Sequence, residues 1–182
     1  MRVAIIPARG GSQRIPRKNI KPFFGQPMIA YSIKAARESG CFDRVIVSTD
    51  DLEIADVAKQ YGAEMPFIRP AGISDDHATT MDVIQHAASW LAESGGKLSY
   101  ICCIYATAPF VRADKLAEGL ESVTQPGVDY AFSATTFPFP IQRALKVTET
   151  GTVSMFMPEH QNIRSQDLEE AIHDAGQFYW GT

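Results

Sequence analysis

Short apolar runs alternate with amphipathic helical patterns along most of the chain, and this alternation restricts the fold more than any other feature. An apolar run, a helical pattern and a second apolar run in succession are typical of an α/β domain with a parallel sheet. We therefore expect a three-layer, Rossmann-like fold with a mostly parallel sheet, in which the most apolar strand, at residues 100–105, is central. The expected strands are 3–6, 44–49, 64–68, 100–105 and 129–134, and the expected helices run from Pro27 to Gly40, at 52–61, through 83–91 and at 114–123.

The alternation ends near residue 137. The run Phe-Pro-Phe-Pro at 137–140 interrupts helix and strand alike. Residues 144–156 are predicted to form a hairpin around Thr150-Gly151, and a last strand is predicted at 176–180. With 182 residues and 45% apolar content, we expect a single domain over residues 1–182, in which 137–172 form a small β-rich insertion.

Basic residues are concentrated at the N-terminus of an acidic chain. The net charge is −4, which argues against general nucleic-acid binding. Every residue with a charged side chain before Glu38 is basic, and such local charge indicates a discrete anionic ligand. The alternative is a solvated basic edge.

Hydropathy and cysteine usage bound the compartment. No run of about 18 apolar residues is present, so no membrane span is expected. Three cysteines without a C-x-x-C pair indicate buried, reduced thiols in a cytoplasmic protein.

A glycine-rich loop follows the first expected strand. Gly10, Gly11 and Ser12 could line a concavity for an anion with backbone N–H groups and a hydroxyl, although a plain turn is the alternative reading. The loop matches neither the P-loop nor the dinucleotide fingerprint. Because ligands bind at the carboxyl ends of parallel strands, this loop, Asp50-Asp51 and Arg69-Pro70 should share one rim.

Several motifs together resemble a known family. They are IPARGGS at 6–12, RIPRKNIK at 14–21, VSTDD at 47–51 and RP at 69–70. These motifs resemble the nonulosonic-acid cytidylyltransferases, which include the CMP-sialic acid synthetases. YATAPF at 105–110, FPIQRA at 139–144 and RSQD at 164–167 are similar to the members that use pseudaminic acid.

The resemblance implies a nucleotidyltransferase fold and a reaction in which CTP and a nine-carbon α-keto acid sugar give the CMP-sugar and pyrophosphate. It implies a place in bacterial surface-glycan synthesis or flagellin glycosylation. Because protein groups in such a transfer act mainly by positioning and charge stabilisation, a basic loop suits it. By motif position, Arg9 and Lys18 would be catalytic contacts to the triphosphate, and the nucleotide-binding set would be Ala8, Arg9, Gly10, Gly11, Ser12, Lys18, Asn19 and Thr79.

Other polar residues near these motifs have simpler readings. Arg14, Arg17 and Lys21 could serve solubility alone. Asp50 is expected to cap the second helix. Arg69 could position substrate or form an ion pair with Asp75 or Asp76.

The sugar side is implied by the same resemblance. A pseudaminate pocket needs a cation for the carboxylate, amide partners and an apolar wall. Sialic-acid members usually carry glutamine where this chain has Tyr105. A sialic or legionaminic acid substrate and a catalytically inactive nucleotide-binding module remain the alternatives. The expected substrate-binding residues are Arg69, Tyr105, Gln142, Arg143, Arg164, Gln177 and Tyr179.

The resemblance also implies Mg²⁺ and a homodimer. The family's Asp-x-Asp motif, which supplies metal ligands, does not occur in the residues up to Thr182, so those ligands are expected beyond Thr182 and the chain is expected to be a shortened form. The insertion at 137–172 is expected to take part in dimerisation. The four histidines lack the spacing of a zinc site.

Overall fold

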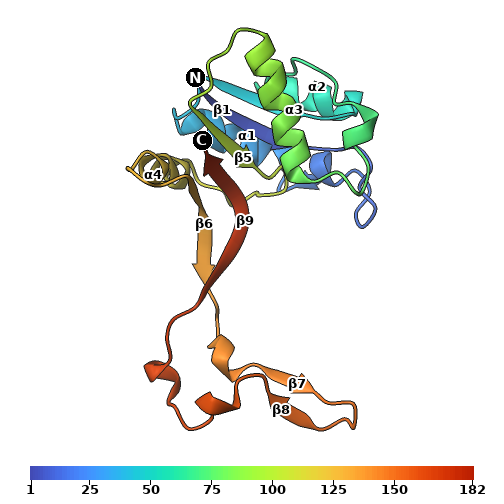
Figure 1. Ribbon diagram of the computed structural model, residues 1–182. Coiled ribbons are helices and arrows are strands. Elements are labelled where there is room, and N and C mark those ends of the chain that lie inside the picture. The colour runs from blue at the N-terminus through green and yellow to red at the C-terminus, as the bar shows by residue number, and fades with distance from the viewer. The chain divides into compact units, whose positions relative to one another are not determined.

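The computed structural model describes residues 1–182 as two compact units (Figure 1). The first unit contains Met1–Ser133 and Gly176–Thr182, and the second contains Ala134–Ala175. The expected insertion at 137–172 therefore lies inside the second unit. Its expected part in dimerisation stays a prediction.

A five-stranded sheet organises the first unit. The strand order is β4 (Arg44–Ser48), β1 (Arg2–Pro7), β5 (Tyr100–Ile104), β9 (Ile172–Gly181) and β6 (Tyr130–Thr136). Strand β1 runs parallel to β4 and β5, and β9 is antiparallel to β5. The expected central position of the apolar strand is confirmed, since β5 is the middle strand.

Helices cover both faces of this sheet because side chains alternate along each strand. Ala4 and Ile6 of β1 face the core shared with α1 (Met28–Glu38), α2 (Leu52–Gln60) and α4 (Ala113–Val123). Val3 and Ile5 face the opposite way and pack against Leu91 of α3 (Thr80–Glu93). Figure 1 shows α3 crossing one face of the sheet. This is the expected three-layer arrangement.

Trp180 anchors strand β9 to the helical layer. The side chain is fully buried, stacks on Phe42 with ring centroids 4.8 Å apart, and donates from Nε1 to the Leu116 carbonyl of α4 at 3.0 Å. The last strand begins at Ile172, earlier than the predicted residue 176, and its antiparallel direction makes the sheet mixed.

The strand predicted at 64–68 is wrong. Glu64 forms an isolated bridge with Ile46, and no strand follows it. Pro66 explains the difference because it lacks the N–H that would continue the ladder. The segment still reaches the sheet rim, since the Arg69 N–H donates to the Thr49 carbonyl at 2.8 Å.

The remaining elements are short. The predicted hairpin is confirmed as β7 (Leu145–Val147) paired antiparallel with β8 (Val153–Met155) in the second unit. A second small hairpin, β2 (Pro22–Phe23) with β3 (Gln26–Pro27), follows the basic loop. The 3-10 helices are Lys18–Ile20, Ala71–Ile73, Ile141–Arg143, Pro158–His160 and Ser165–Asp167. None of the helices has the length and apolar character that a membrane crossing requires.

Candidate active site

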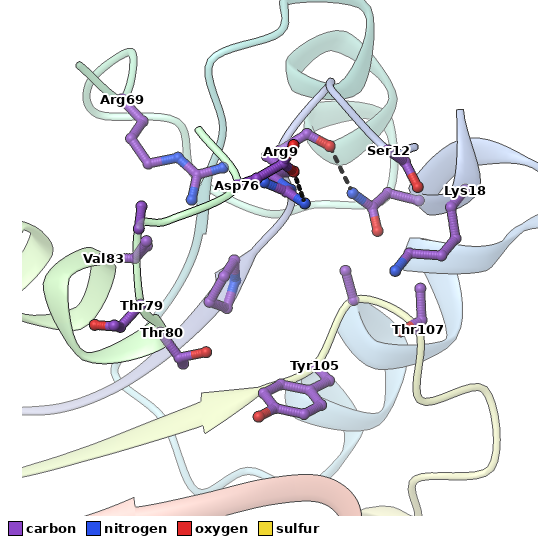
Figure 2. Close-up of a pocket in the computed structure, with 14 residues that line it drawn as sticks. Arg9, Ser12, Lys18, Arg69, Asp76, Thr79, Thr80, Val83, Tyr105 and Thr107 are labelled. Carbon is purple, nitrogen blue, oxygen red and sulfur yellow. Dashed lines mark hydrogen bonds and ion pairs between the residues drawn. The ribbon is translucent and has the colours of Figure 1, made fainter. Parts of the chain in front are cut away.

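A cavity of about 310 Å³ opens at the carboxyl ends of β1 and β5, beside the first turn of α3 (Figure 2). It lies where parallel α/β sheets bind ligands. Seven of the predicted site residues meet here, and Asp76, Thr80 and Thr107 join them. The seven are Arg9, Ser12, Lys18, Asn19, Arg69, Thr79 and Tyr105.

The glycine loop is shaped from within the protein. The Gly10 N–H donates to Asp50 Oδ1 at 2.9 Å, and the Ser12 N–H donates to the Gly10 carbonyl at 2.9 Å. Two of the backbone donors that the sequence offered for an anion are therefore already used. A Cβ on Gly10 would lie 2.7 Å from Asp51 Oδ2, whereas one on Gly11 would meet nothing within 4 Å. Of these two loop glycines, close packing thus requires only Gly10.

The rest of the predicted loop set lies around this turn. Ala8 is buried in the core beneath the loop, and Gly10 and Gly11 line a neighbouring cavity of about 470 Å³ on the loop's other side. The Asn19 amide is buried and donates from Nδ2 to the Arg9 carbonyl at 2.9 Å. Asn19 therefore holds the backbone at the residue whose side chain enters the cavity.

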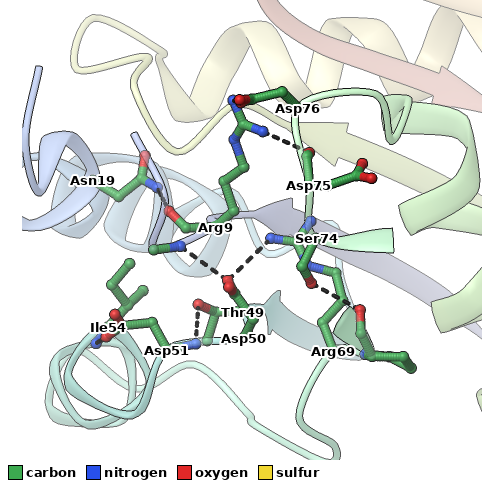
Figure 3. A network of polar contacts seen from close by, with 12 residues as sticks. Arg9, Asn19, Thr49, Asp50, Asp51, Ile54, Arg69, Ser74, Asp75 and Asp76 are labelled. Carbon is green, nitrogen blue, oxygen red and sulfur yellow. Dashed lines mark hydrogen bonds and ion pairs between the residues drawn. The ribbon is translucent and has the colours of Figure 1, made fainter. Parts of the chain in front are cut away.

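Arg69 is the most unusual group in the cavity. Its side chain is 4% exposed, and its Nε and Nη2 atoms have no hydrogen-bond partner. Asp50 Oδ1 lies 3.7 Å from Nη2, beyond hydrogen-bonding distance (Figure 3). Burial, and secondarily the like charge of Arg9, lower the pKa of the Arg69 guanidinium despite the attraction of Asp50. A buried donor of this kind needs an acceptor.

The predicted role of Asp50 as the cap of α2 is wrong. Asp51 takes that place, since its side chain accepts the Ile54 N–H at 3.0 Å. Asp50 instead stands between the Gly10 N–H and Arg69 (Figure 3). Both residues are acids that directly follow strand β4. The path of the backbone at this point decides which of the two side chains reaches the first turn of α2.

Arg9 is paired with the loop that precedes α3. Its guanidinium contacts Asp76 Oδ1 at 2.6 Å and the Asp75 carbonyl at 2.6 Å. Gln13 also donates to the Asp76 carboxylate. The ion pair expected for Arg69 with Asp75 or Asp76 is wrong. Asp76 pairs with Arg9, the Asp75 carboxylate accepts the N–H groups of His77 and Ala78, and the carboxylate beside Arg69 is Asp50.

Lys18 enters the cavity from the 3-10 helix Lys18–Ile20 and forms no ion pair. Figure 2 shows its amine across the cavity from Arg69 and Thr80. Three cationic side chains, from Lys18, Arg9 and Arg69, thus surround one space. Such a cluster attracts a multiply charged anion.

Thr79 and Thr80 have different roles. Thr79 is the N-cap of α3 in a full capping box, because it accepts the Asp82 N–H at 3.2 Å and its own N–H donates to the Asp82 carboxylate. Its hydroxyl is therefore committed to the helix, whereas Figure 2 shows the Thr80 hydroxyl pointing to the cavity. Sequence reasoning missed Thr80, although a capping box at 79–82 signals which threonine is free.

A second cavity adjoins the first and is mostly apolar. Its volume is about 460 Å³, and Tyr105, Tyr179 and Ile101 line it. The rings of Tyr105 and Tyr179 are 5.4 Å apart. Gln177 uses its backbone here, since its carbonyl accepts the Tyr105 N–H at 2.9 Å. Tyr105, Thr79 and Thr80 line both the polar and the apolar cavity, whereas Tyr179 lines the apolar cavity alone.

The other predicted sugar contacts belong to the second unit. The Gln142 amide donates to the Glu169 carbonyl at 3.0 Å, and Arg143 donates to the Ile163 carbonyl. Arg164 pairs with Asp167 at 2.6 Å. Gln142 Oε1 and Arg143 Nε are buried without partners. The role of these residues in a sugar pocket stays a prediction.

The carboxylates, histidines and cysteines do not form a ready metal site. No group of three or more such side chains is placed to hold a metal ion. Asp76 is a carboxylate of the cavity wall, and it pairs with Arg9. The residues present therefore do not fit an all-protein Mg²⁺ site, and the chemistry proposed below rests on the cations.

Comparison with known families places the chain in a class. The family model described as "Cytidylyltransferase" matches residues 3–179. The chain belongs to this cytidylyltransferase family. The expected class, a CTP-dependent nucleotidyltransferase, is thereby confirmed.

Two relatives and one solved structure are similar to the chain over nearly its whole length. The chain is 49% identical over 180 residues to the pseudaminic acid cytidylyltransferase of Campylobacter jejuni subsp. jejuni serotype O:2, covering 99% of this chain and 78% of that one. It is 36% identical over 177 residues to the N-acylneuraminate cytidylyltransferase of Oncorhynchus mykiss, covering 97% of this chain and 40% of the relative. A solved structure of CMP:2-keto-3-deoxy-manno-octonic acid synthetase complexed with CTP aligns with a TM-score of 0.70 at 19% identity, covering 99% and 73% of the two chains. The last match confirms the expected fold.

Proposed function

We propose that this protein transfers CMP from CTP to pseudaminic acid and forms CMP-pseudaminic acid and pyrophosphate. Membership of the cytidylyltransferase family and 49% identity to a pseudaminic acid cytidylyltransferase support the reaction. The single observation of the structure that carries it is the cavity in which Arg69, Arg9 and Lys18 converge. Three cations around one space suit a triphosphate better than a monoanionic ligand.

The bond changes follow from the substrates. The anomeric hydroxyl oxygen of the sugar attacks the α-phosphorus of CTP, a new O–P bond forms, and the bond to the β-phosphate oxygen breaks. Pyrophosphate leaves with that electron pair, and the hydroxyl proton is released. Negative charge therefore grows on the leaving group. Fixed cations aimed at it lower the barrier because they need no reorganisation during the reaction.

The cavity residues suggest distinct roles. Arg9 and Lys18 contact phosphate oxygens, and Arg9 exchanges its Asp76 partner for them. Arg69 donates its unpaired N–H groups to an acceptor of the nucleotide. Thr80 offers a further hydroxyl from the start of α3. Mg²⁺ carried by the phosphates would add charge neutralisation, and none of the residues described above is assigned as its ligand.

The apolar cavity beside Tyr105 and Tyr179 supports a deoxygenated sugar. Pseudaminate ends in a methyl group and carries acylated amines, and its carboxylate needs a cation. An aromatic wall favours the methyl terminus over a hydroxylated one, because an unpaired hydroxyl against apolar groups is costly.

Parallel turnover assays test the proposal. The purified protein is incubated with CTP, Mg²⁺ and one sugar at a time, and pyrophosphate release is followed together with formation of the CMP-sugar. We expect turnover with pseudaminic acid at a kcat/KM well above that with sialic or legionaminic acid. Release with sialic or legionaminic acid alone would refute the sugar assignment. Tight CTP binding with no release for any sugar would instead indicate an inactive nucleotide-binding module.

We also propose a homodimer in the cytoplasm. The second unit exposes apolar side chains, with Phe139 62%, Val147 75% and Val153 63% exposed, and contacts with a second copy would cover them. Cys102 and Cys103 are free and buried, which suits a reducing compartment. Light scattering on the intact protein tests the dimer, and a monomeric mass throughout the micromolar range would refute it.

A further inference from the structure

Arg17 adopts an unusual backbone conformation next to the phosphate-binding residues. Its φ and ψ angles are 53° and 30°, in the left-handed region that residues other than glycine and asparagine rarely occupy. Such a strained position persists only where the surroundings hold it. The holding contacts come from the Arg17 side chain, for which the sequence left a role in solubility as one of two readings.

The guanidinium of Arg17 is clamped on the start of α2. Nη1 donates to Asp51 Oδ2, and Nη2 donates to Asp51 Oδ1 at 3.0 Å and also to Glu53. This is the two-pronged geometry that arginine forms with a carboxylate and lysine does not. Hydrogen bonding from Arg17 is the largest cause that lowers the pKa of the Asp51 carboxyl.

Asp51 is itself held in a fixed position. Its Oδ1 accepts the Ile54 N–H at 3.0 Å as the cap of α2, and its own N–H donates to Thr49 Oγ1 at 3.1 Å (Figure 3). The side chain is 20% exposed. Arg17 is therefore tied to a rigid helix end. The loop that carries it is also anchored by Asn19 on the Arg9 carbonyl and by Gln13 on the Asp76 carboxylate.

The residues immediately after Arg17 are the ones that enter the cavity. The 3-10 helix Lys18–Ile20 begins at the next residue, and the Ile20 N–H donates to the Arg17 carbonyl at 3.0 Å. Lys18 lines the cavity and Arg17 does not. The left-handed turn at Arg17 thus sends its own side chain to α2 and the next side chain to the cavity.

We propose that Arg17 is a positioning residue, whose paired hydrogen bonds to Asp51 hold the turn that presents Lys18 to the phosphates of the nucleotide. The proposal rests on the proposed function, in which Lys18 contacts the triphosphate. Arg17 acts through Lys18 and through the start of α2, and it does not touch the substrate. Without the paired hydrogen bonds between Arg17 and Asp51, the Lys18 side chain can take many orientations. Binding of the nucleotide must then also order Lys18, which lowers the affinity.

Titration calorimetry with CTP and Mg²⁺ on the intact protein tests the clamp. Arg17→Ala should raise the Kd for CTP about tenfold, within the range found for coupled neighbours. Arg17→Lys keeps the charge without the fork and should recover only part of this loss. Arg14→Ala is the matched control, because Arg14 is an exposed cation of the same loop, and its Kd should stay within about twofold of the unaltered protein. Equal losses for Arg14→Ala and Arg17→Ala would overturn the proposal in favour of a general charge effect.

Substitution of Asp51, the partner of Arg17, gives a test that depends on the direction of the change in Kd. Asp51→Asn keeps an oxygen that can cap α2, since asparagine caps helices well, but it removes the charge that Arg17 grips. If only the electrostatic field mattered, loss of a negative charge near the site would tighten CTP binding. The clamp predicts weaker binding by several-fold. Tighter binding by Asp51→Asn would therefore overturn the proposal.

A double substitution shows whether the effect passes through Lys18. In a Lys18→Ala background, adding Arg17→Ala should change the Kd by less than about twofold, because the group being positioned is gone. A full tenfold further loss would mean that Arg17 acts independently of Lys18. Thermal unfolding of each variant identifies any that has lost the fold, and Arg17→Gly, which accepts the left-handed turn, replaces Arg17→Ala in that case. If the unaltered protein binds no CTP, the proposed function fails; if it does and Arg17→Ala binds equally well, the clamp alone fails.

Discussion

Arg69 offers a sharp test of the site, because substituting it should separate binding from stability. The side chain is 4% exposed, lacks hydrogen-bond partners at two nitrogens and shares the cavity with two other cations. We predict that Arg69→Met weakens CTP binding strongly and leaves the stability of the free protein nearly unchanged. Methionine keeps most of the length and apolar stem of the arginine.

The magnitudes follow from the geometry. At 3.7 Å, the attraction between Arg69 and Asp50 is about 4 kcal/mol at an effective dielectric constant of roughly 20. Desolvation of a buried ion costs several kcal/mol and offsets this gain. The carboxylate left behind is 30% exposed and keeps its hydrogen bond from Gly10, so it is not stranded. We expect a change of less than about 1 kcal/mol in the free energy of unfolding.

The binding loss is larger because no offset exists there. Hydrogen bonds to a charged donor contribute about 1.5–3 kcal/mol each. Loss of one such contact corresponds to a rise in Kd of roughly 10-fold to 150-fold. The ratio of the two effects, rather than either alone, identifies a residue kept for its ligand.

Titration calorimetry with CTP and urea unfolding of the same preparations measure both quantities. Arg44→Met is the matched control, because Arg44 is bonded through Nε and Nη2 to Glu64 at 2.9 and 2.6 Å and lies over the Trp90 ring. It should lower the free energy of unfolding and leave the Kd unchanged. If Arg69→Met bound CTP normally, or if it lost several kcal/mol of stability, Arg69 would be a structural residue and the reasoning would be wrong.

Three further predictions concern the loop and its acidic neighbours. Gly10→Ala should destabilise the fold by about 1–3 kcal/mol because its Cβ would lie 2.7 Å from Asp51 Oδ2, whereas Gly11→Ala should be tolerated; equal losses in thermal unfolding would contradict this. The pKa of Asp51 is lowered in the folded protein, so its ionised carboxylate stabilises the fold above the ordinary pKa of 3.8, and this stability is lost as the pH falls through the folded-state pKa. In urea unfolding, the difference in free energy of unfolding between the unaltered protein and Asp51→Asn should therefore narrow below pH 3.8. A difference that does not depend on pH would argue against the ion pair. Asp76→Asn should tighten CTP binding a few-fold in calorimetry because it frees Arg9, and a tenfold weakening would instead make Asp76 a ligand contact.

Much of the fold could be predicted from the sequence because the periodicity of the apolar residues is strong. Residues 100–105 are apolar throughout, as a strand buried on both faces must be, and β5 is central. The failure at 64–68 has a local cause, since Pro66 interrupts the apolar residues Met65, Phe67 and Ile68. The direction of β9 could not be read from its pattern, because alternation along a strand is the same in parallel and antiparallel pairs.

The candidate site was predictable as a rim but not as a network. The rule that ligands bind at the carboxyl ends of strands brought Arg9 and Arg69 together correctly. Hydrogen-bond partners depend on chain direction within one or two residues, which sequence spacing does not determine. For this reason the sequence predicted Asp50 rather than Asp51 as the cap of α2, and it did not show that Arg17 is bonded to Asp51.

The polar network also explains how the site can keep its positive charge when no ligand is bound. Asp50 links the loop after β1, through the Gly10 N–H, to Arg69 on the segment after residue 64. Asp76 pairs with Arg9 from the segment before α3. Each carboxylate compensates a cation only partly, because Asp50 lies beyond hydrogen-bonding distance and Asp76 is 43% exposed. The free protein therefore stays folded with cations that remain under-neutralised, and an entering triphosphate supplies acceptors that the protein itself withholds.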